Sequence, residues 1–443
     1  MNKEDLKKIA VEEIDKNRDE IVQLGNSILM EPEEGFREFK TSKKIEDFFK
    51  KMEIEFKSGL AITGIKGYLS KERKGPSIGI IGELDALFNP EHPLADRKNG
   101  LAHACGHFAQ IASMIGTGIG LAKVINYLDG NVVLFGVPAE EYINLEFRER
   151  LRKEEKIKFF GGKQELIRIG EFDDIDIAIM THAQSSPERK AFIPESSNSF
   201  VGKNIKFIGK ASHAGYAPFS GINALNAFNV ALSAIHAQRE TFRDEDAVRV
   251  HLIVTKGGDS VNIVPSEIKV EMYVRAKTIE AVEDAALKVD RALKGGALSV
   301  GCKVEITQIA GYLQLNSDKN LSQLWANNAT AILGEGNVQS VPHFGGSTDM
   351  GDITNIKPGI HPSTGGFEGE PHTKDFKIVD EEMAYILPAK INALTVIDLL
   401  FNNAEKGKDI IVSFRPKFTK EEYLKLLDSL NYQVLWPSDE KQV

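Results

Sequence analysis

Three residues that can bind a metal ion alternate within one short segment, His103-Ala104-Cys105-Gly106-His107. Cysteine thiolate and imidazole nitrogen are both good ligands for zinc and for similar divalent ions. The glycine and the apolar stretch after it predict that a helix begins here, and a helix N-terminus lowers the pKa of a thiol. The structural alternative is an inert buried cysteine between two surface histidines, because buried free cysteine is common.

Two adjacent acids, Glu140 and Glu141, follow Pro138 at the end of an apolar run. If a cleft holds both carboxylates, a cation must offset their repulsion. One acid can then bind metal while the other acts as a general base toward water. Taken in isolation, the pair is equally compatible with a solvated turn, because acidic side chains are mostly exposed.

Two further histidines are weak signals when each is considered alone. His182 follows a third apolar run, and His372 lies in the segment Glu370–Phe376; a single histidine of this kind is usually structural. Together with Cys105, His107 and Glu141 they supply enough nitrogen, oxygen and sulfur ligands for two metal ions about 3.5–4 Å apart.

These chemical groups follow the ends of three predicted strands. The strands are the apolar runs 76–82, 132–137 and 175–180. A helix predicted at about 108–127 lies between the first two, and strands that alternate with helices indicate an α/β fold with a mostly parallel sheet covered by helices. Open sheets of this kind bind ligands outside the carboxyl ends of their strands. We therefore predict that three sets of side chains meet at one edge of the sheet: Glu83 and Asp85, Glu140 and Glu141, and His182.

A different pattern begins at about Ser197. Predicted strands and helices follow in the order βαββαβ, which is typical of a ferredoxin-like module. We expect residues 198–312 to form an inserted second domain. The segments 1–197 and 313–443 would then form one discontinuous metal-binding domain.

A charged C-terminal extension starts at about residue 405. It contains one strand-like run, Ile410–Val412, and one predicted helix near Lys420–Leu430.

Composition narrows the class of protein further. The net charge of -9 disfavours a nucleic-acid or anionic-membrane surface. The only cysteines, Cys105 and Cys302, are too few for a secreted disulfide scaffold. The N-terminus is charged and has no apolar signal core, and no run approaches the roughly 18 apolar residues of a membrane span. We therefore expect a cytoplasmic protein with neither nucleic acid nor membrane as a partner.

In combination these motifs resemble peptidase family M20, the aminoacylase/carboxypeptidase-like metallopeptidases, and most of all its amidohydrolase branch. The resemblance runs from about Leu24 to Asn403. The motifs that carry it are Glu31-Pro32-Glu33-Glu34-Gly35-Phe36, Gly82-Glu83-Leu84-Asp85-Ala86-Leu87, His103-Ala104-Cys105-Gly106-His107, Pro138-Ala139-Glu140-Glu141, Gly209-Lys210-Ala211-Ser212-His213-Ala214 and Asn262-Ile263-Val264-Pro265. Gly161-Gly162-Lys163 and Gly346–Gly351 are similar to the subgroup of aminobenzoyl-glutamate hydrolases and related dipeptidases.

The resemblance implies an amidohydrolase with two divalent metal ions in each copy of the chain. Cys105 would bridge or bind the metals, and four residues would complete their shells: His107, Glu141, His182 and His372. Glu140 would be the general base that moves a proton from water to the leaving amine, and Asp85 would orient a ligand. Zinc is the expected metal because thiolate favours it, with manganese, cobalt or nickel as alternatives.

The inserted domain resembles the family's lid and dimerisation domain, which implies a homodimer. His213 would reach the active site of the other protomer and stabilise the oxyanion. Asn262 and Arg275 would hold the carboxylate of a small substrate, although Arg275 is equally compatible with an ordinary surface strand. The expected substrate is an N-acyl or N-aroyl amino acid, or a dipeptide with a free carboxylate.

Some positions depart from the family pattern. Phe108 stands where the family usually has Asp or Asn, and Ala183-Gln184 replaces a bulkier sequence after His182. Glu83 stands where other branches carry a metal-binding histidine, so we do not count it as a ligand. His103 lies outside the ligand pair.

Two other functions stay open. The first is a catalytically impaired binding or assembly protein of the same fold. The second is a thiol hydrolase with Cys105 as its nucleophile, which would keep working after chelation of all metal.

Overall fold

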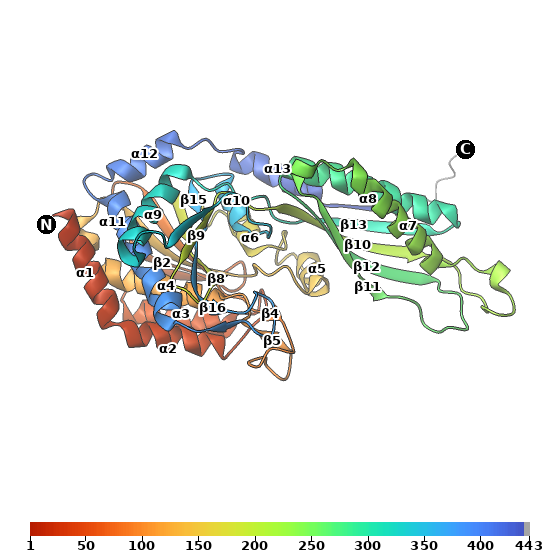
Figure 1. Cartoon of the computed structure of the whole chain (residues 1–443), viewed down its shortest axis with the longest axis horizontal. Coiled ribbons are helices and arrows are strands. Elements are labelled where there is room, and N and C mark those ends of the chain that lie inside the picture. The colour runs from red at the N-terminus through yellow and green to blue at the C-terminus, as the bar shows by residue number, and fades with distance from the viewer. Residues whose placement is uncertain (438–443) are drawn as a thin grey trace. The chain divides into compact units, whose positions relative to one another are not determined.

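The computed structural model describes residues 1–437 of the chain. They form two compact units (Figure 1). Unit 1 comprises Met1–Ser196, Leu315–Phe344 and Thr348–Lys420, and unit 2 comprises Ser197–Gln314, Gly345–Ser347 and the chain from Glu421 onward.

A six-stranded sheet forms the centre of unit 1, in the order β1-β2-β6-β3-β7-β15. Its strands are β1 (Glu55–Leu60), β2 (Gly64–Ser70), β6 (Asn131–Val137), β3 (Ser77–Glu83), β7 (Ile177–Met180) and β15 (Gly359–Ile360). The last four run parallel, while β1 and β2 are antiparallel. The apolar runs of β3, β6 and β7 are buried almost throughout, as expected for strands covered on both faces.

Helices enclose this sheet. They are α1 (Lys3–Lys16), α2 (Arg18–Leu29), α3 (Phe39–Lys51), α4 (His107–Ala122), α5 (Leu145–Lys153), α6 (Gly162–Arg168), α9 (Lys319–Leu333), α10 (Met350–Thr354), α11 (Leu387–Leu400) and α12 (Glu405–Ser413), with short turns η1 (Ile125–Tyr127) and η5 (Glu382–Ile386). Helix α4 is the predicted apolar helix, and it contacts β3 as well as α1, α2 and α11. The helical stretch Glu382–Leu400 is long and apolar enough to span a membrane, but it is completely buried inside the structure and is therefore assigned as a core helix.

Shorter strands complete unit 1. A second sheet has the order β14-β9-β16-β17, with β8 paired to β16, and β4 pairs with β5. These strands are β14 (Val338–Val341), β9 (Ala191–Pro194), β16 (Ser363–Glu368), β17 (Lys377–Ile378), β8 (His182–Ser185), β4 (Leu87–Phe88) and β5 (Leu101–Ala102).

Unit 2 has the predicted βαββαβ order. Its elements are β10 (Ser199–Ile208), α7 (Ala224–Gln238), β11 (Arg249–Lys256), β12 (Glu267–Ala276), α8 (Ile279–Ser299) and β13 (Lys303–Ala310), with short turns η2 (Pro218–Ser220), η3 (Arg239–Thr241) and η4 (Asp244–Asp246). Both helices contact each other, β10 and β12, and alternate residues of β12 are buried, so α7 and α8 cover one face of the sheet (Figure 1). The fold class predicted from the sequence, α/β with a ferredoxin-like insertion, is confirmed.

The C-terminal extension differs from the predicted organisation. The run Ile410–Val412 belongs to helix α12, not to a strand, because three apolar residues are too few to define a period. Helix α13 (Lys420–Leu430) forms as predicted. Strand β18 (Tyr432–Trp436) then pairs antiparallel with β13, so the chain from Glu421 packs with unit 2 and not with the discontinuous domain.

A buried polar network fixes β18 on this sheet. Lys203 Nζ donates to Asp290 Oδ1 at 2.6 Å and to the hydroxyl of Tyr432 at 3.0 Å. The Tyr432 hydroxyl in turn donates to Asp290 Oδ2 at 2.5 Å. A buried ammonium requires such partners, so Tyr432 of β18 helps to satisfy a lysine in the middle of the sheet.

Candidate metal centre

The carboxyl ends of three parallel strands carry the predicted ligands. The loop after β3 holds Asp85, the loop after β6 holds Glu140 and Glu141, and His182 follows β7. Adjacent parallel strands end at the same edge of a sheet. The order β6-β3-β7 therefore brings these three loops side by side.

Gly106 makes the turn that adds Cys105 and His107 to this edge. It caps helix α4 with φ of 96°, in the left-handed region that favours glycine. A Cβ at this position would lie 2.3 Å from the Cβ of Ala183, next to His182. The chain can therefore place Cys105 close to His182 only if the residue between Cys105 and His107 is glycine.

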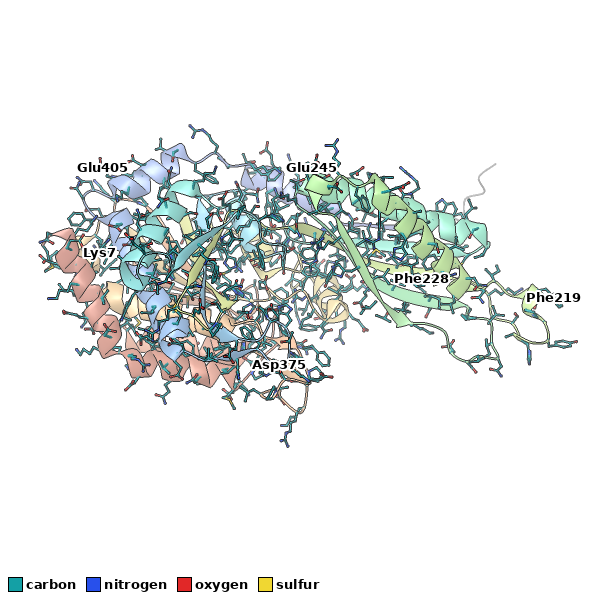
Figure 2. The ribbon with its side chains drawn as sticks, in the orientation of Figure 1. Lys7, Phe219, Phe228, Glu245, Asp375 and Glu405 are labelled. Carbon is teal, nitrogen blue, oxygen red and sulfur yellow. The ribbon has the colours of Figure 1, made fainter. Side chains whose placement is uncertain are left out.

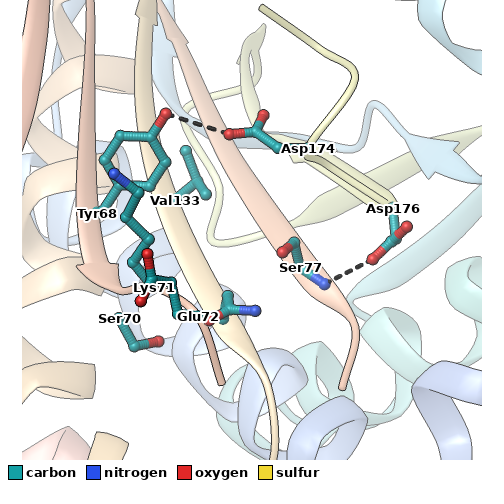
Figure 3. Close-up of a pocket in the computed structure, with 9 residues that line it drawn as sticks. Tyr68, Ser70, Lys71, Glu72, Ser77, Val133, Asp174 and Asp176 are labelled. Carbon is teal, nitrogen blue, oxygen red and sulfur yellow. Dashed lines mark hydrogen bonds between the residues drawn. The ribbon is translucent and has the colours of Figure 1, made fainter. Parts of the chain in front are cut away.

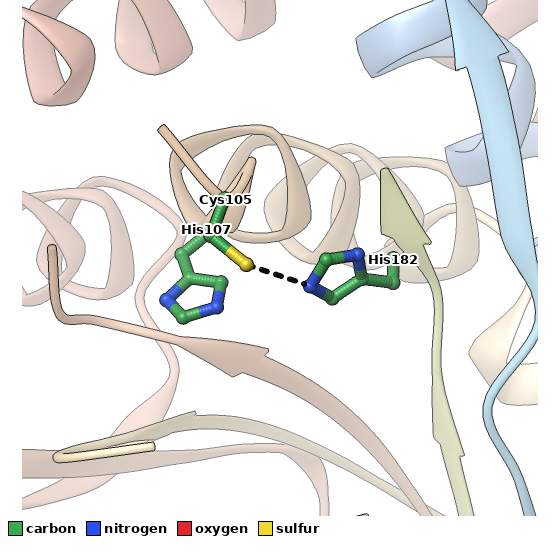
Figure 4. Close-up of side chains that lie close together, drawn as sticks. All are labelled: Cys105, His107 and His182. Carbon is green, nitrogen blue, oxygen red and sulfur yellow. Dashed lines mark hydrogen bonds between the residues drawn. The ribbon is translucent and has the colours of Figure 1, made fainter. Parts of the chain in front are cut away.

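Cys105, His107 and His182 form one group of possible ligands (Figure 4). The thiol Sγ lies 3.5 Å from His182 Nε2, and the three ligand atoms all lie within 4.8 Å of one another. His182 Nδ1 donates to the carbonyl of Ala183 at 2.7 Å, which leaves Nε2 to face the cysteine. The rings of His107 and His182 are 5.7 Å apart and nearly perpendicular.

Cys105 also belongs to a second group, with Glu141 and His372. His372 Nε2 lies 3.3 Å from Glu141 Oε1. The backbone N–H of His372 donates to the carbonyl of Ala104 at 2.8 Å, which ties its loop to the cysteine segment. One thiol is thus shared by two sets of possible ligand atoms.

Asp85 orients members of both groups. Its Oδ2 accepts the backbone N–H of Glu141 at 2.8 Å. The carbonyl of Asp85 accepts a hydrogen bond from His107 Nδ1, also at 2.8 Å. Since Nδ1 carries this proton, Nε2 is the atom of His107 that can bind a metal.

The electrostatics of the cluster favour a cation. Burial raises the pKa of the Cys105 thiol, but His182 and His107 outweigh it and bring the pKa down to about 6. Burial also raises the pKa of Glu141, but His372 outweighs it and lowers that pKa to about 2. Burial, Glu83 and Glu141 raise the pKa of Glu140 well above its usual value. The thiolate of Cys105 and the carboxylate of Glu141 thus place negative charge beside the histidines.

The donor set fits divalent metal ions. Buried Asp85 Oδ1, His107 Nε2 and Glu141 Oε1 have no hydrogen-bond partner among the described residues. Leaving a buried polar atom unsatisfied costs about 1–3 kcal/mol, so three such atoms in one cluster indicate an absent binding partner. Thiolate, imidazole and carboxylate together form a typical ligand set for zinc and related ions.

A separate pocket lies at the opposite, amino ends of the parallel strands (Figure 3). It has a volume of about 340 Å³, and its walls include Tyr68, Ser77, Asp174 and Asp176. The Tyr68 hydroxyl donates to Asp174 at 3.1 Å, and the Ser77 N–H donates to Asp176 at 2.8 Å. Neither histidine nor cysteine lines this pocket, and the candidate ligand groups among the described residues lie at the carboxyl edge.

The three residues predicted to bind substrate all lie in unit 2. The loop of His213 pairs with that of Asn262, because Ala214 N–H donates to the carbonyl of Asn262 at 2.9 Å. Arg275 belongs to another cluster on β12, where it donates to Ser347 Oγ at 2.9 Å and to His251 Nε2 at 3.2 Å. The structure therefore brings His213 and Asn262 together and gives Arg275 its own polar surroundings.

The sequence and the fold of this chain are similar to those of known proteins. A family model described as the peptidase dimerisation domain matches residues 196–299. The Xaa-Arg dipeptidase of Mus musculus is 28% identical over 90% of this chain and 90% of its own length. A homolog of p-aminobenzoyl-glutamate hydrolase from Haemophilus influenzae is 24% identical over 59% of this chain and 60% of its own. A solved Bacillus subtilis structure, described as a dinuclear metal binding peptidase from the M20 family, has a TM-score of 0.64, 22% identity, and coverage of 86% of this chain and 98% of that one.

The chain contains an M20 peptidase dimerisation domain and is a homologue of the Xaa-Arg dipeptidases and aminobenzoyl-glutamate hydrolases. The family resemblance predicted from the spaced motifs is thereby confirmed, including its similarity to dipeptidases and aminobenzoyl-glutamate hydrolases.

Phe108, the departure next to the metal-binding motif, has a packing role in this M20 homologue. Its buried ring contacts the rings of Tyr385 and Phe367, with centroids 6.2 and 6.4 Å away. The ring of His103 lies 5.6 Å away, edge-on. His103 belongs to none of the three candidate metal groups found among residues 1–437. Phe108 therefore replaces a polar side chain with part of an aromatic cluster.

Three polar residues near the candidate metal centre were not predicted from the sequence as members of the site. Buried His361 lies edge-on to His182, with ring centroids 5.4 Å apart. Lys163 and Asp349 are both fully buried and form an ion pair. The two glycine-containing motifs pointed to Lys163 and Asp349 as family marks, but nothing in their local sequence indicated that they meet.

Proposed function

We propose that this M20 homologue is a dinuclear metal-dependent amidohydrolase. Its substrates would be small N-acyl or N-aroyl amino acids, or dipeptides with a free carboxylate. The observation that carries the proposal is that the thiol of Cys105 belongs to two groups of possible ligands. It lies within 4.8 Å of ligand atoms of His107 and His182, and likewise within 4.8 Å of ligand atoms of Glu141 and His372. The dipeptidase name of a relative that matches nine-tenths of the chain supports the class of reaction.

The five ligand residues would hold two divalent ions, with zinc favoured by the thiolate and manganese, cobalt or nickel as alternatives. Such ions polarise a carbonyl oxygen and lower the pKa of water. Glu140, whose Oε2 lies 3.9 Å from His107 Nε2, would accept the proton of the attacking water and return it to the leaving amine. Asp85 would keep Glu141 and His107 in place through its two hydrogen bonds.

Unit 2 would supply the groups that bind the substrate. His213 Nδ1 accepts the backbone N–H groups of Gly215 and Tyr216 at 3.2 and 2.9 Å. Its proton must therefore be on Nε2, where it can be donated to an oxyanion. Arg275 stacks over the ring of Phe200, 5.0 Å from its centroid, which supports a guanidinium fork that could hold a carboxylate. Asn262 lies with His213 beyond the other end of β12, so it would reach such a carboxylate only from a second copy of the chain.

We further propose that unit 2 forms a homodimer. Large apolar side chains are exposed in the loops around His213 and Asn262: Tyr216 is 84%, Phe219 87% and Val261 101% exposed. Figure 2 labels Phe219 on its loop. Contiguous exposed apolar residues mark interaction sites. The match to a dimerisation domain over residues 196–299 supports a second copy as the partner. Light scattering of the wild type and of Phe219→Ser would test this, and a monomeric wild type would refute it.

The decisive test is metal analysis and a substrate screen on the same preparation. We expect about two ions for each copy of the chain, with hydrolysis of at least one N-acyl amino acid or dipeptide after addition of zinc, manganese or cobalt. Activity that survives complete chelation would support a thiol hydrolase instead. Ligand binding without turnover across the whole panel would support an impaired binding protein.

A further inference from the structure

A buried ion-pair network contacts the metal centre at His107. Lys163 Nζ lies 2.6 Å from Glu83 Oε1 and also forms an ion pair with Asp349. The side chains of Lys163 and Asp349 are 0% exposed and that of Glu83 is 1% exposed. Removing an ion from water costs several kcal/mol, so a buried lysine between two acids calls for a reason beyond stability.

The backbone around Lys163 is fixed to the loop of the proposed base. Gly162 N–H donates to the carbonyl of Ala139 at 3.2 Å, and a Cβ on Gly162 would lie 1.7 Å from the carbonyl oxygen of Pro138. Only glycine allows helix α6 to dock this closely on the segment that leads to Glu140. Asp349 Oδ2 also accepts the backbone N–H of Lys163 at 3.3 Å, so the lysine is held at both its backbone and its ammonium.

Lys163 and Gln110 together hold the carboxylate of Glu83 in one orientation. Oε1 accepts from Lys163, and Oε2 accepts from Gln110 Nε2 at 2.7 Å. Gln110 Oε1 in turn accepts the backbone N–H of Glu83 at 3.2 Å. With both oxygens engaged, the carboxylate cannot rotate, and Oε2 keeps a second lone pair for another partner.

That second lone pair faces a ligand atom of the metal centre. Glu83 Oε2 lies 3.1 Å from His107 Nε2, yet Nε2 has no hydrogen-bond partner among the described residues. Bonds of about 2.0–2.2 Å to zinc place neighbouring nitrogen and oxygen ligands slightly more than 3 Å apart. Glu83, His107 and Glu140 also form the third candidate metal group, with ligand atoms within 4.8 Å of one another.

We infer that Glu83 is a further ligand of the ion held by His107, and that Lys163 is the positioning residue that aims it. The inference rests on the proposed metal-dependent function and revises the sequence interpretation, in which Glu83 was not a ligand. Glu83 shares its candidate group with His107 and Glu140, so Glu83 Oε2 would add an oxygen donor beside His107 Nε2. The ammonium of Lys163 offsets the carboxylate charge without occupying the oxygen that faces the metal.

The test compares metal binding by the wild type, Glu83→Gln and Lys163→Met. In Glu83→Gln the amide oxygen stays with Lys163, so an NH₂ group replaces the oxygen that faces His107. We expect each variant to retain one tight ion and to bind the other at least tenfold more weakly in chelator competition, since even outer residues of metal sites change affinity by about 10–100-fold. The absorption spectrum of the cobalt-loaded protein should change for one of its two ions.

Lys203→Met provides the matched control. Lys203 is likewise fully buried and paired with an acid, Asp290, at 2.6 Å, but it lies in unit 2. This variant should lose stability and keep both ions at wild-type affinity. If Lys163→Met does not fold, Lys163→Arg keeps the charge while displacing Glu83, and it should still weaken one ion.

The outcomes separate this inference from the proposed function. A wild type that binds no metal overturns the metal-dependent function itself. A folded Glu83→Gln that binds both ions as tightly as the wild type, with an unchanged cobalt spectrum, overturns only the role of Glu83. That second result would mean that Glu83 and His107 form an ordinary buried ion pair.

Discussion

Replacing Gly106 by alanine should disturb both the stability and the metal affinity of this M20 homologue. The backbone at Gly106 has φ of 96°, and an added Cβ would lie 2.3 Å from the Cβ of Ala183. A residue with a side chain loses about 1–2 kcal/mol in the left-handed region. Overpacking costs about 1–3 kcal/mol more, so we expect the free energy of unfolding to fall by roughly 2–5 kcal/mol.

Gly336→Ala separates the two contributions. Gly336 also has a positive φ, of 82°, but nothing lies within 4 Å of the position of its Cβ. This control should lose only the backbone part, about 1–2 kcal/mol. Urea unfolding in the presence of chelator measures both variants without a contribution from bound metal.

The effect on the metal centre follows from the same contact. Ala183 follows His182, so relief of the clash must move either Cys105 or His182 and lengthen their 3.5 Å separation. Gly106→Ala should therefore bind metal more weakly, whereas Gly336→Ala should bind it as the wild type does. The reasoning fails if Gly106→Ala is as stable as Gly336→Ala and retains both ions.

Four other changes have expected outcomes. Glu140→Gln should lower kcat by about 10²–10⁴-fold with no loss of metal by mass spectrometry, and normal turnover would contradict its role as base. Cys105→Ala should lose both ions, whereas Cys302→Ala, whose thiol donates to the carbonyl of Ile208 and belongs to none of the candidate metal groups among the described residues, should retain them. Burial and Asp85 raise the pKa of Glu38 from 4.5 to about 8. Between these two pH values the folded state keeps a proton that the unfolded state loses. The free energy of unfolding should therefore fall as pH rises from 4.5 toward 8. Glu38→Gln should flatten that slope in urea titrations, and an unchanged slope would contradict the assignment. Deletion of residues 432–443 should destabilise unit 2 and promote self-association through the uncovered edge of β13, detectable by light scattering.

Much of the metal centre could be predicted because its residues follow clear apolar runs. The strands before these residues are almost entirely apolar, which predicts burial on both faces. Their ends are followed at once by Glu140, Glu141 and His182. The parallel order of these strands then brings the residues together without further information. Helix α4 was predictable for a similar reason, since its apolar residues surround the whole helix.

The contacts that escaped prediction depend on distant pairs. Lys163 and Asp349 are 186 residues apart, and a lysine in a helix is by default a solvated side chain. Lys203 and Tyr432 are separated by 229 residues, so nothing local indicates that β18 joins the sheet of unit 2. The orientation of Glu83 likewise depends on Lys163 and Gln110, which come from two different helices.

The position of β18 also has a consequence for how the chain assembles during synthesis. Strands β10 to β13 leave the ribosome more than a hundred residues before β18, and domains generally fold as units while translation continues. Until Tyr432 has been synthesised, the ammonium of Lys203 lacks one of its hydrogen-bond partners, and the edge of β13 has no strand paired with it. The inserted domain therefore passes through an interval with an uncovered strand, in which nascent chains on neighbouring ribosomes can pair wrongly.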